Sequence, residues 1–228
     1  MRDLKQYIKE SILTDFETLS NNDNIIFREA IVKFIKDTYA TPSASKFRIS
    51  KKPKVNGKYL VNVSGNVTLK NPSDTEYLTN GLFEFGKVDG DFIIMNYQNG
   101  NRGILKSLEG SPREITGLFR ISEQQLTSLK GRPESVGRLI LCNLDITTLK
   151  DSPKEIYELY ISNTKIKNFE GLPKRIDGNF TCTSNPELVS LEGLPKRVWG
   201  QFTFVNNGKF FDLDTIKNYT DADWYCIE

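Results

Sequence analysis

Side chains that could carry out chemistry are scarce in this sequence, and histidine is absent. That absence removes the usual imidazole base and the commonest transition-metal ligand. Three cysteines occur, Cys142, Cys182 and Cys226, without a metal-ligand spacing such as C-x-x-C. Their odd number favours free thiols in a reducing compartment over a disulfide scaffold. We therefore expect a protein without catalytic residues rather than an enzyme.

Two kinds of charged cluster remain as candidate ligand sites. The pairs Asp212/Asp214 and Asp221/Asp223 could hold a hard cation, but no calcium loop with a glycine and a closing glutamate surrounds them. The basic residues 46–54 could contact phosphate, but this segment lacks a clear aromatic platform and is more typical of a solvated linker. Lys+Arg number 31 and Asp+Glu 29, so the net charge favours neither nucleic acid nor an anionic membrane. We expect no metal, cofactor, nucleic acid or membrane partner.

Repetition along the chain is a stronger signal than any single motif. Residues 190–200 (SLEGLPKRVWG) nearly duplicate residues 168–178 (NFEGLPKRIDG). Proline recurs at positions 112, 133, 153, 173 and 195, at intervals of 21, 20, 20 and 22 residues. Such a period predicts a stacked architecture in which each unit buries its apolar residues against its neighbours.

Each unit contains the pattern of a short strand. An Ile or Val follows the proline by three positions, and an alternating apolar pair comes next. These pairs are Phe119/Ile121, Leu139/Leu141, Leu159/Ile161, Phe180/Cys182 and Phe202/Phe204. Alternation with period two indicates a strand with one buried face. Fainter copies at residues 63–69 and 88–94 bring the predicted stack to seven rungs.

A polar residue follows each of the five predicted strands, three positions before the next apolar residue. These residues are Glu123, Asn143, Asn163, Asn185 and Asn207. An amide side chain has both a donor and an acceptor. We therefore expect stacked copies to satisfy the backbone groups that are exposed where the strand turns away.

The residues between the buried positions define a candidate binding surface. If Leu139 and Leu141 point inward, Ile140 must point outward, and the same holds for its equivalents in the other units. The predicted binding residues are Arg120, Arg138, Ile140, Glu158, Tyr160, Thr181 and Thr203. Aromatic and arginine anchors dominate the energetics of protein contact sites. Alternatively, Ile140 and Tyr160 are ordinary sheet-face residues that suit a strand.

The ends of the chain are expected to cover the stack. Residues 1–39 are predicted to be helical, because Leu4, Ile8 and Ile12 recur at helical spacing and a similar stripe follows Asn22 or Asp23, a plausible N-cap. Trp199 and Trp224 are expected to seal the last rung. Residues 47–49 and 59–61 are candidates for an edge hairpin. The predicted division is a helical cap (1–43), irregular entry rungs (44–106), five regular repeats (107–211) and a C-terminal cap (212–228).

The pattern P-x-x-I/V-x-x-L-x-I-x-N-x-x-I-x-x-L in residues 153–169 resembles the short bacterial type of leucine-rich repeat. VSGNVTL (63–69), LTNGLFEFGKVDGDF (78–92) and SLEGSPREITG (107–117) are similar to leucine-rich-repeat proteins of tailed phages and their hosts. The first helix is similar to the leaders that load proteins into phage heads. The resemblance implies an α+β fold, a leucine-rich-repeat-like solenoid with a parallel β-sheet on one face and an N-terminal helical cap.

The expected function is therefore non-enzymatic binding of a protein partner through the strand face. Two alternatives stay open: an internal virion protein that is targeted by its first helix, or an inhibitor of a host defence protein. The N-terminal residues have no continuous apolar run, so we expect neither a secretory signal nor a membrane span. The expected location is the cytoplasm of a bacterial host or the virion.

Overall fold

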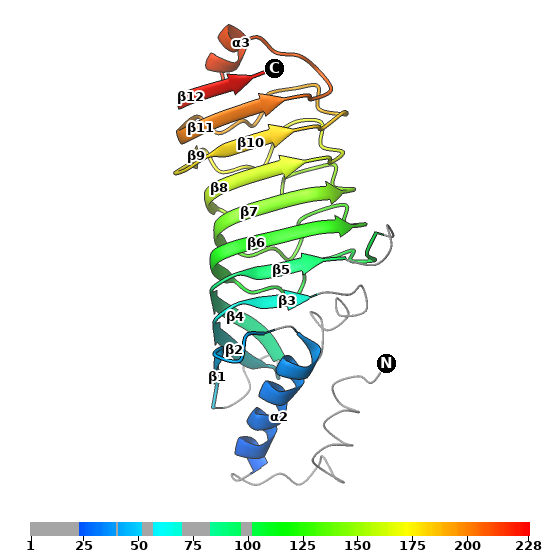
Figure 1. Cartoon of the computed structure of the whole chain (residues 1–228), viewed down its shortest axis with the longest axis vertical. Helices are drawn as coiled ribbons and strands as arrows, with labels where there is room; N and C mark the ends of the chain where they lie inside the picture. Colours follow the sequence, from blue (N-terminus) through cyan, green and yellow to red (C-terminus); the bar gives the residue numbers. More distant parts are fainter. Residues whose placement is uncertain (1–22, 40, 52–56, 70–82, 97–101) are drawn as a thin grey trace.

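The computed structural model describes residues 23–39, 41–51, 57–69, 83–96 and 102–228. In these ranges one twelve-stranded sheet winds into an elongated stack with a helix at each end (Figure 1). The helices are α2 (Asp23–Thr38) and α3 (Leu213–Lys217). The strands are β1 (Lys46–Ile49), β2 (Tyr59–Ser64), β3 (Val67–Leu69), β4 (Phe83–Asp89), β5 (Phe92–Met95), β6 (Glu114–Gln124), β7 (Ser135–Leu144), β8 (Glu155–Ser162), β9 (Arg175–Ile176), β10 (Phe180–Thr183), β11 (Arg197–Val205) and β12 (Asp221–Ile227).

Neighbouring strands from β2 to β12 pair in parallel. Each of the proline-marked units supplies one rung, and β2 with β3 and β4 with β5 supply the two fainter ones. The structure therefore confirms a parallel β-solenoid of about seven turns. It adds β12, a strand within residues that the sequence analysis assigned to a C-terminal cap. β1 pairs antiparallel with β2, as the predicted edge hairpin requires, but residues 47–49 pair with 61–63 rather than with 59–61.

The interior of the stack is mainly apolar along its whole length. The predicted inward pairs are all buried, including Phe119 with Ile121 and Leu139 with Leu141. Phenylalanine rings of successive rungs contact one another, and the rings of Phe180 and Phe202 stack with centroids 5.1 Å apart. Burying one such side chain contributes roughly 1.5–3 kcal/mol. Because each rung contacts only its neighbours, the stabilisation comes from stacking rather than from a central core.

The turns after the strands occupy a backbone region that most residues avoid. Positive φ angles occur at Glu123 (56°), Asn143 (54°), Asn163 (51°), Ser184 (56°) and Asn206 (53°). In the last two rungs the positive φ falls one residue earlier than the predicted Asn185 and Asn207. Glu123, Asn143 and Asn163 therefore occupy the positive-φ position of their turns, whereas Asn185 and Asn207 lie one position after it. Short polar side chains tolerate this backbone region better than branched ones, which explains the asparagines.

Asn185 occupies the second of these positions and points inward. Its side chain is fully buried, and its Oδ1 accepts hydrogen bonds from the backbone and hydroxyl of Thr164 at 3.0 and 2.7 Å. Its Nδ2 donates to the Thr183 carbonyl at 2.9 Å and to Oδ1 of Asn207 at 3.0 Å. This amide therefore joins three rungs, as expected of a side chain that satisfies exposed backbone groups.

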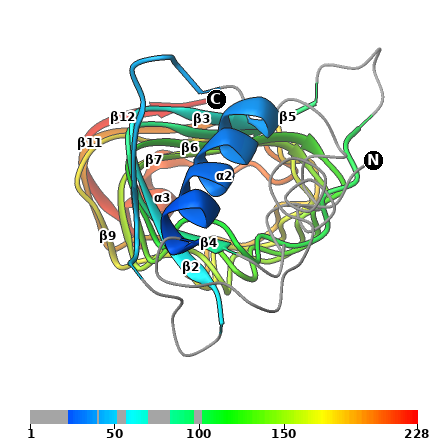
Figure 2. The ribbon, with the colours of Figure 1, turned by 90° about the horizontal axis from the view of Figure 1, so that it is seen from below.

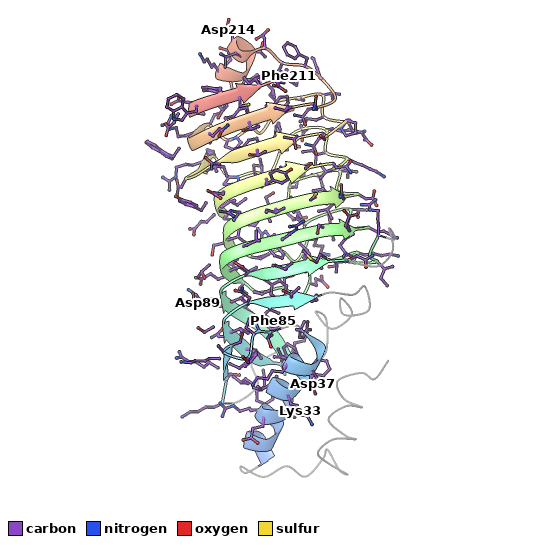
Figure 3. All side chains as sticks on the ribbon, viewed as in Figure 1. Lys33, Asp37, Phe85, Asp89, Phe211 and Asp214 are labelled. Carbon is purple, nitrogen blue, oxygen red and sulfur yellow. The ribbon has the colours of Figure 1, made fainter. Side chains whose placement is uncertain are left out.

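α2 lies across the N-terminal end of the stack (Figure 2). Ala30, Ile31, Phe34 and Ile35 are buried, which is the one-sided spacing of a helix that packs on a core. The ring centroids of Phe34 and Phe83 are 6.4 Å apart, and those of Tyr39 and Phe85 are 5.7 Å apart. Phe85 is labelled in Figure 3. The predicted stripe of Leu4, Ile8 and Ile12 lies outside the described residues.

The opposite end is covered by α3 and its flanking segments. Ile216 of α3 is fully buried, and Phe211 packs against Phe204 with ring centroids 5.9 Å apart (Figure 3). The prediction that Trp199 and Trp224 seal this end is wrong, because their side chains are 55% and 75% exposed. The aliphatic and phenylalanine side chains exclude water from the last rung instead.

Candidate binding surface

The register of the sheet places the predicted outward residues in one line across the solenoid. Arg120 of β6 pairs with Ile140 of β7, and Ile140 pairs with Tyr160 of β8. The line continues through Thr181 of β10 to Thr203 of β11. We call Arg120, Ile140, Tyr160, Thr181 and Thr203 the outer row. Parallel strands are about 5 Å apart, so neighbouring side chains of this row are in contact range.

A second line of side chains runs beside the outer row and contains an ion pair. Leu118, Arg138 and Glu158 are register partners on β6, β7 and β8. Nε of Arg138 lies 2.5 Å from Oε2 of Glu158. The Arg138 side chain is 56% exposed, so the pair contributes little to stability, about 0–1 kcal/mol. The ion pair holds the Arg138 guanidinium beside Ile140, which lies two positions further along β7 on the same face of the strand.

The outer row is less exposed than the sequence analysis expected. Ile140 and Tyr160 are half-buried, as are Thr181 and Thr203. Adjacent rungs are so close that each side chain covers part of the next one. The row is therefore a flat, continuous surface rather than a series of protruding anchors. Side chains that are already held by their neighbours lose less conformational freedom when a partner binds.

Arg120 has one polar atom without a partner. Its Nε is buried and forms no hydrogen bond within the described part of the chain. Burial raises the pKa of Cys142, which lies beside this guanidinium, and the positive charge of Arg120 opposes that rise. A buried donor without an acceptor costs free energy. A binding partner that brings an acceptor close to Arg120 would recover part of that cost.

The three cysteines differ in burial. Cys142 is half-buried and Cys226 is exposed. Cys226 of β12 pairs with Thr203, so it stands at the C-terminal end of the outer row. Cys182 is buried in the core, and burial raises its pKa. All three are free thiols.

The paired carboxylates have structural roles. Asp212 caps α3 by accepting a hydrogen bond from the backbone of Thr215, and this bond lowers the pKa of its carboxyl. Asp221 and Asp223 both pair with Arg197, at 2.7 and 2.5 Å. Among the residues with described positions, no group of three or more Cys, Asp or Glu could hold a metal ion.

Several large apolar side chains that the sequence analysis did not consider for binding are exposed. Tyr157, Val189 and Phe210 are 57%, 55% and 70% exposed, and none of them belongs to the outer row. Tyr157 directly follows the buried Ile156 of its unit, which was the available signal for an outward position. They are scattered over the solenoid, and single exposed apolar residues are common in proteins.

The fold and this surface define the class of the protein, a parallel β-solenoid with a flat outer face. No family model matches the chain, and comparisons with curated proteins and with solved structures return no match. None of the described helices has both the length and the apolar composition that crossing a membrane requires.

Proposed function

We propose that this protein is a non-enzymatic binding module that binds a protein partner through the outer row. The observation that carries the proposal is the alignment of Arg120, Ile140 and Tyr160 on three successive strands, beside the Arg138–Glu158 ion pair. Arginine and aromatic side chains supply most of the energy in protein interfaces. A flat row held in place by a rigid sheet suits such a contact, because little ordering is needed on binding.

The repeat pattern supports a finer proposal about the architecture and origin of the chain. We take the solenoid to be of the leucine-rich-repeat type found in tailed phages and their hosts, on the strength of the motifs at residues 63–69, 78–92 and 107–117. Repeat solenoids of this kind present extended binding surfaces. In this proposal the helical cap comprises α2 together with the segment that precedes it.

The test compares two tyrosines on the same strand. Immobilised wild-type protein is used to capture partners from the native cell, next to a Tyr160→Ala/Arg138→Ala double variant and a Tyr157→Ala control. Tyr157 is exposed but lies outside the outer row, so its loss should leave capture unchanged. A partner that the wild type and the control capture, and the double variant does not, supports the proposal once purified partner reproduces the difference in titrations.

Thermal unfolding of the double variant checks that its fold is intact. Its melting temperature should stay close to that of the wild type, because Tyr160 is half-buried and the ion pair is weak. If the double variant is folded and captures the same proteins with unchanged affinity, the outer row is not the binding surface.

A further inference from the structure

A cavity of about 580 Å³ lies at the N-terminal end of the solenoid, where α2 and β1 meet β2 and β4. Four basic side chains line it: Arg28 of α2, Lys46 and Arg48 of β1, and Lys87 of β4. Asp89 is the one carboxylate among its lining residues. The basic segment that the sequence analysis assigned to a solvated linker therefore belongs, in its first part, to a site with additional cations from two other elements.

The local structure explains why these charges face the same space. Lys46 and Arg48 alternate along β1, so both side chains leave the same face of the strand. They pair with Ser64 and Asn62 of β2 in the antiparallel register. Side chains of directly paired residues lie on the same side of a sheet, so a hydroxyl and an amide stand beside the two cations.

The guanidinium of Arg28 is held in position but incompletely bonded. Its Nη2 donates to the carbonyl of Ile49 at 3.1 Å, which fixes the side chain against the end of β1. Its Nε is buried and has no hydrogen-bond partner within the described ranges. A buried donor of this kind is costly to leave unpaired, and an anionic acceptor would satisfy it.

The nearby carboxylates do not neutralise the cavity. Asp89 accepts a hydrogen bond from the hydroxyl of Thr116 at 2.9 Å, and Glu114 pairs with Lys87. Arg28, Lys46 and Arg48 form no ion pair with any carboxylate in the described part of the chain. Lys87 is paired with Glu114, so the three remaining cations and the Asp89 carboxylate leave a net charge of about +2, which favours an anion with several acceptor oxygens.

The rest of the lining points to a ligand larger than a bare ion. The volume falls within the range of small-molecule sites. The amide of Asn62 and the hydroxyl of Ser64 lie on the same face as the cations, whereas Phe47 and Val63 alternate to the opposite face of the sheet. We propose that this cavity binds a phosphorylated small molecule of nucleotide size. Arg28, Lys46 and Arg48 hold the phosphate oxygens, and Asn62 and Ser64 contact the polar remainder of the ligand. This site is separate from the outer row and does not depend on the proposed protein partner.

Calorimetric titration of the full chain at low ionic strength tests the proposal, with ADP and inorganic pyrophosphate as probes. ADP should bind more tightly than pyrophosphate, because only ADP carries ribose hydroxyls that can also hydrogen-bond to Ser64. A Lys46→Ala/Arg48→Ala variant should lose about ten-fold or more in affinity for both probes, since charge-assisted hydrogen bonds are the strong ones. Ser64→Ala should weaken the binding of ADP alone, whereas Phe47→Ala should change neither affinity because Phe47 lies on the opposite face of β1.

A Lys154→Ala/Lys174→Ala variant is the matched control, because it removes two exposed lysines far from the cavity. It should bind both probes as the wild type does. Absence of binding of both probes to the wild type would overturn the proposal. An equal loss of affinity in the control variant would also overturn it, because the probes would then be attracted by the overall surface charge. Stronger binding of a single-stranded oligonucleotide than of ADP would overturn it in favour of a nucleic-acid ligand.

Discussion

Asn185 and Asn207 lie in successive rungs, and Nδ2 of Asn185 donates a hydrogen bond to Oδ1 of Asn207 at 3.0 Å. Thr164 takes the equivalent place one rung earlier, where it bonds Oδ1 of Asn185. The equivalent residue of the rung before that is Leu144, which is buried and apolar. Leu144 interrupts the polar line, which resumes one rung earlier at Gln124, a buried amide whose Oε1 accepts a hydrogen bond from the backbone of Leu105 at 3.3 Å.

Replacing Asn185 by leucine should destabilise the protein by about 3 kcal/mol, because several buried backbone and side-chain groups lose their partner. Asn179→Ala is the control: its amide also bonds the next rung, at Gln201, but it is exposed. The control should cost less than about 1 kcal/mol. Urea unfolding measures the loss in the free energy of unfolding for both variants. Equal losses would show that the buried Asn185 amide contributes no more to stability than the exposed Asn179 amide.

Asp145 joins segments that are far apart in sequence. Its carboxylate lies 2.9 Å from Arg102 and 2.8 Å from Lys165. Hydrogen bonds from Lys165 and from Arg102 lower the pKa of Asp145 below its ordinary value of 3.8. Because the folded-state pKa is lowered, the stabilisation is present above about pH 4 and is lost as the pH falls through the folded value.

An Asp145→Asn variant should therefore be less stable than the wild type at neutral pH, and the difference should shrink as the pH falls below about 4. Urea unfolding at a series of pH values gives the comparison. Asp151→Asn, at an exposed position, should show no such difference. A cost for Asp145→Asn that stays constant at acid pH would contradict this account.

Gly171 occupies the turn before a proline with a φ of +104°, and an added Cβ would lie 2.2 Å from the carbonyl oxygen of Leu149. Gly57 also has a positive φ, +76°, but a Cβ there would meet no atom within 4 Å. Gly57→Ala should cost about 1–2 kcal/mol from the backbone alone. Gly171→Ala should cost clearly more, since the backbone of the previous rung must also move. Thermal unfolding measures the loss of stability in both variants. Equal losses would contradict the steric explanation for Gly171.

The three thiols should react with a thiol reagent in a fixed order. Exposed Cys226 should react at once in the native protein, and half-buried Cys142 more slowly because burial raises its pKa. Cys182 should react only on unfolding, because it is buried and its pKa is raised. Mass spectrometry of partly labelled protein identifies each site. Early labelling of Cys182 would contradict its position in the core.

The repeat pattern predicted the stacking because each apolar pair recurs at the same place in its unit. Phe119, Leu139 and Phe180 all proved to be inward, and the register of Arg120, Ile140 and Tyr160 followed from them. The one-residue shift between Asn163 and Asn185 was not predictable in this way. Ser184 takes the positive φ in its rung, and an Asn suits both the turn and the buried position beside it.

The ends of the stack were harder to predict than its middle. The repeat rule stops at the last proline, so the pairing of β12 with β11 had no signal in the periodicity. Trp199 and Trp224 were expected to seal the last rung because the end of a solenoid needs a cover, yet both side chains are exposed. The cavity beside β1 depends on Arg28 and Lys87, which are distant in sequence, so periodicity could not bring them together.

The central claim is that the rungs form one continuous parallel stack, and a distance along the outer face tests it most directly. Ile93 and Cys226 stand in the same line, six strand spacings apart through β6, β7, β8, β10 and β11. The test uses an Ile93→Cys/Cys142→Ser variant that carries one spin label on residue 93 and one on Cys226. The two labels should be about 30 Å apart by pulsed electron paramagnetic resonance. A narrow distribution near that value is the predicted result. A broad distribution, or a distance beyond about 45 Å, would contradict a single stack at this strand spacing.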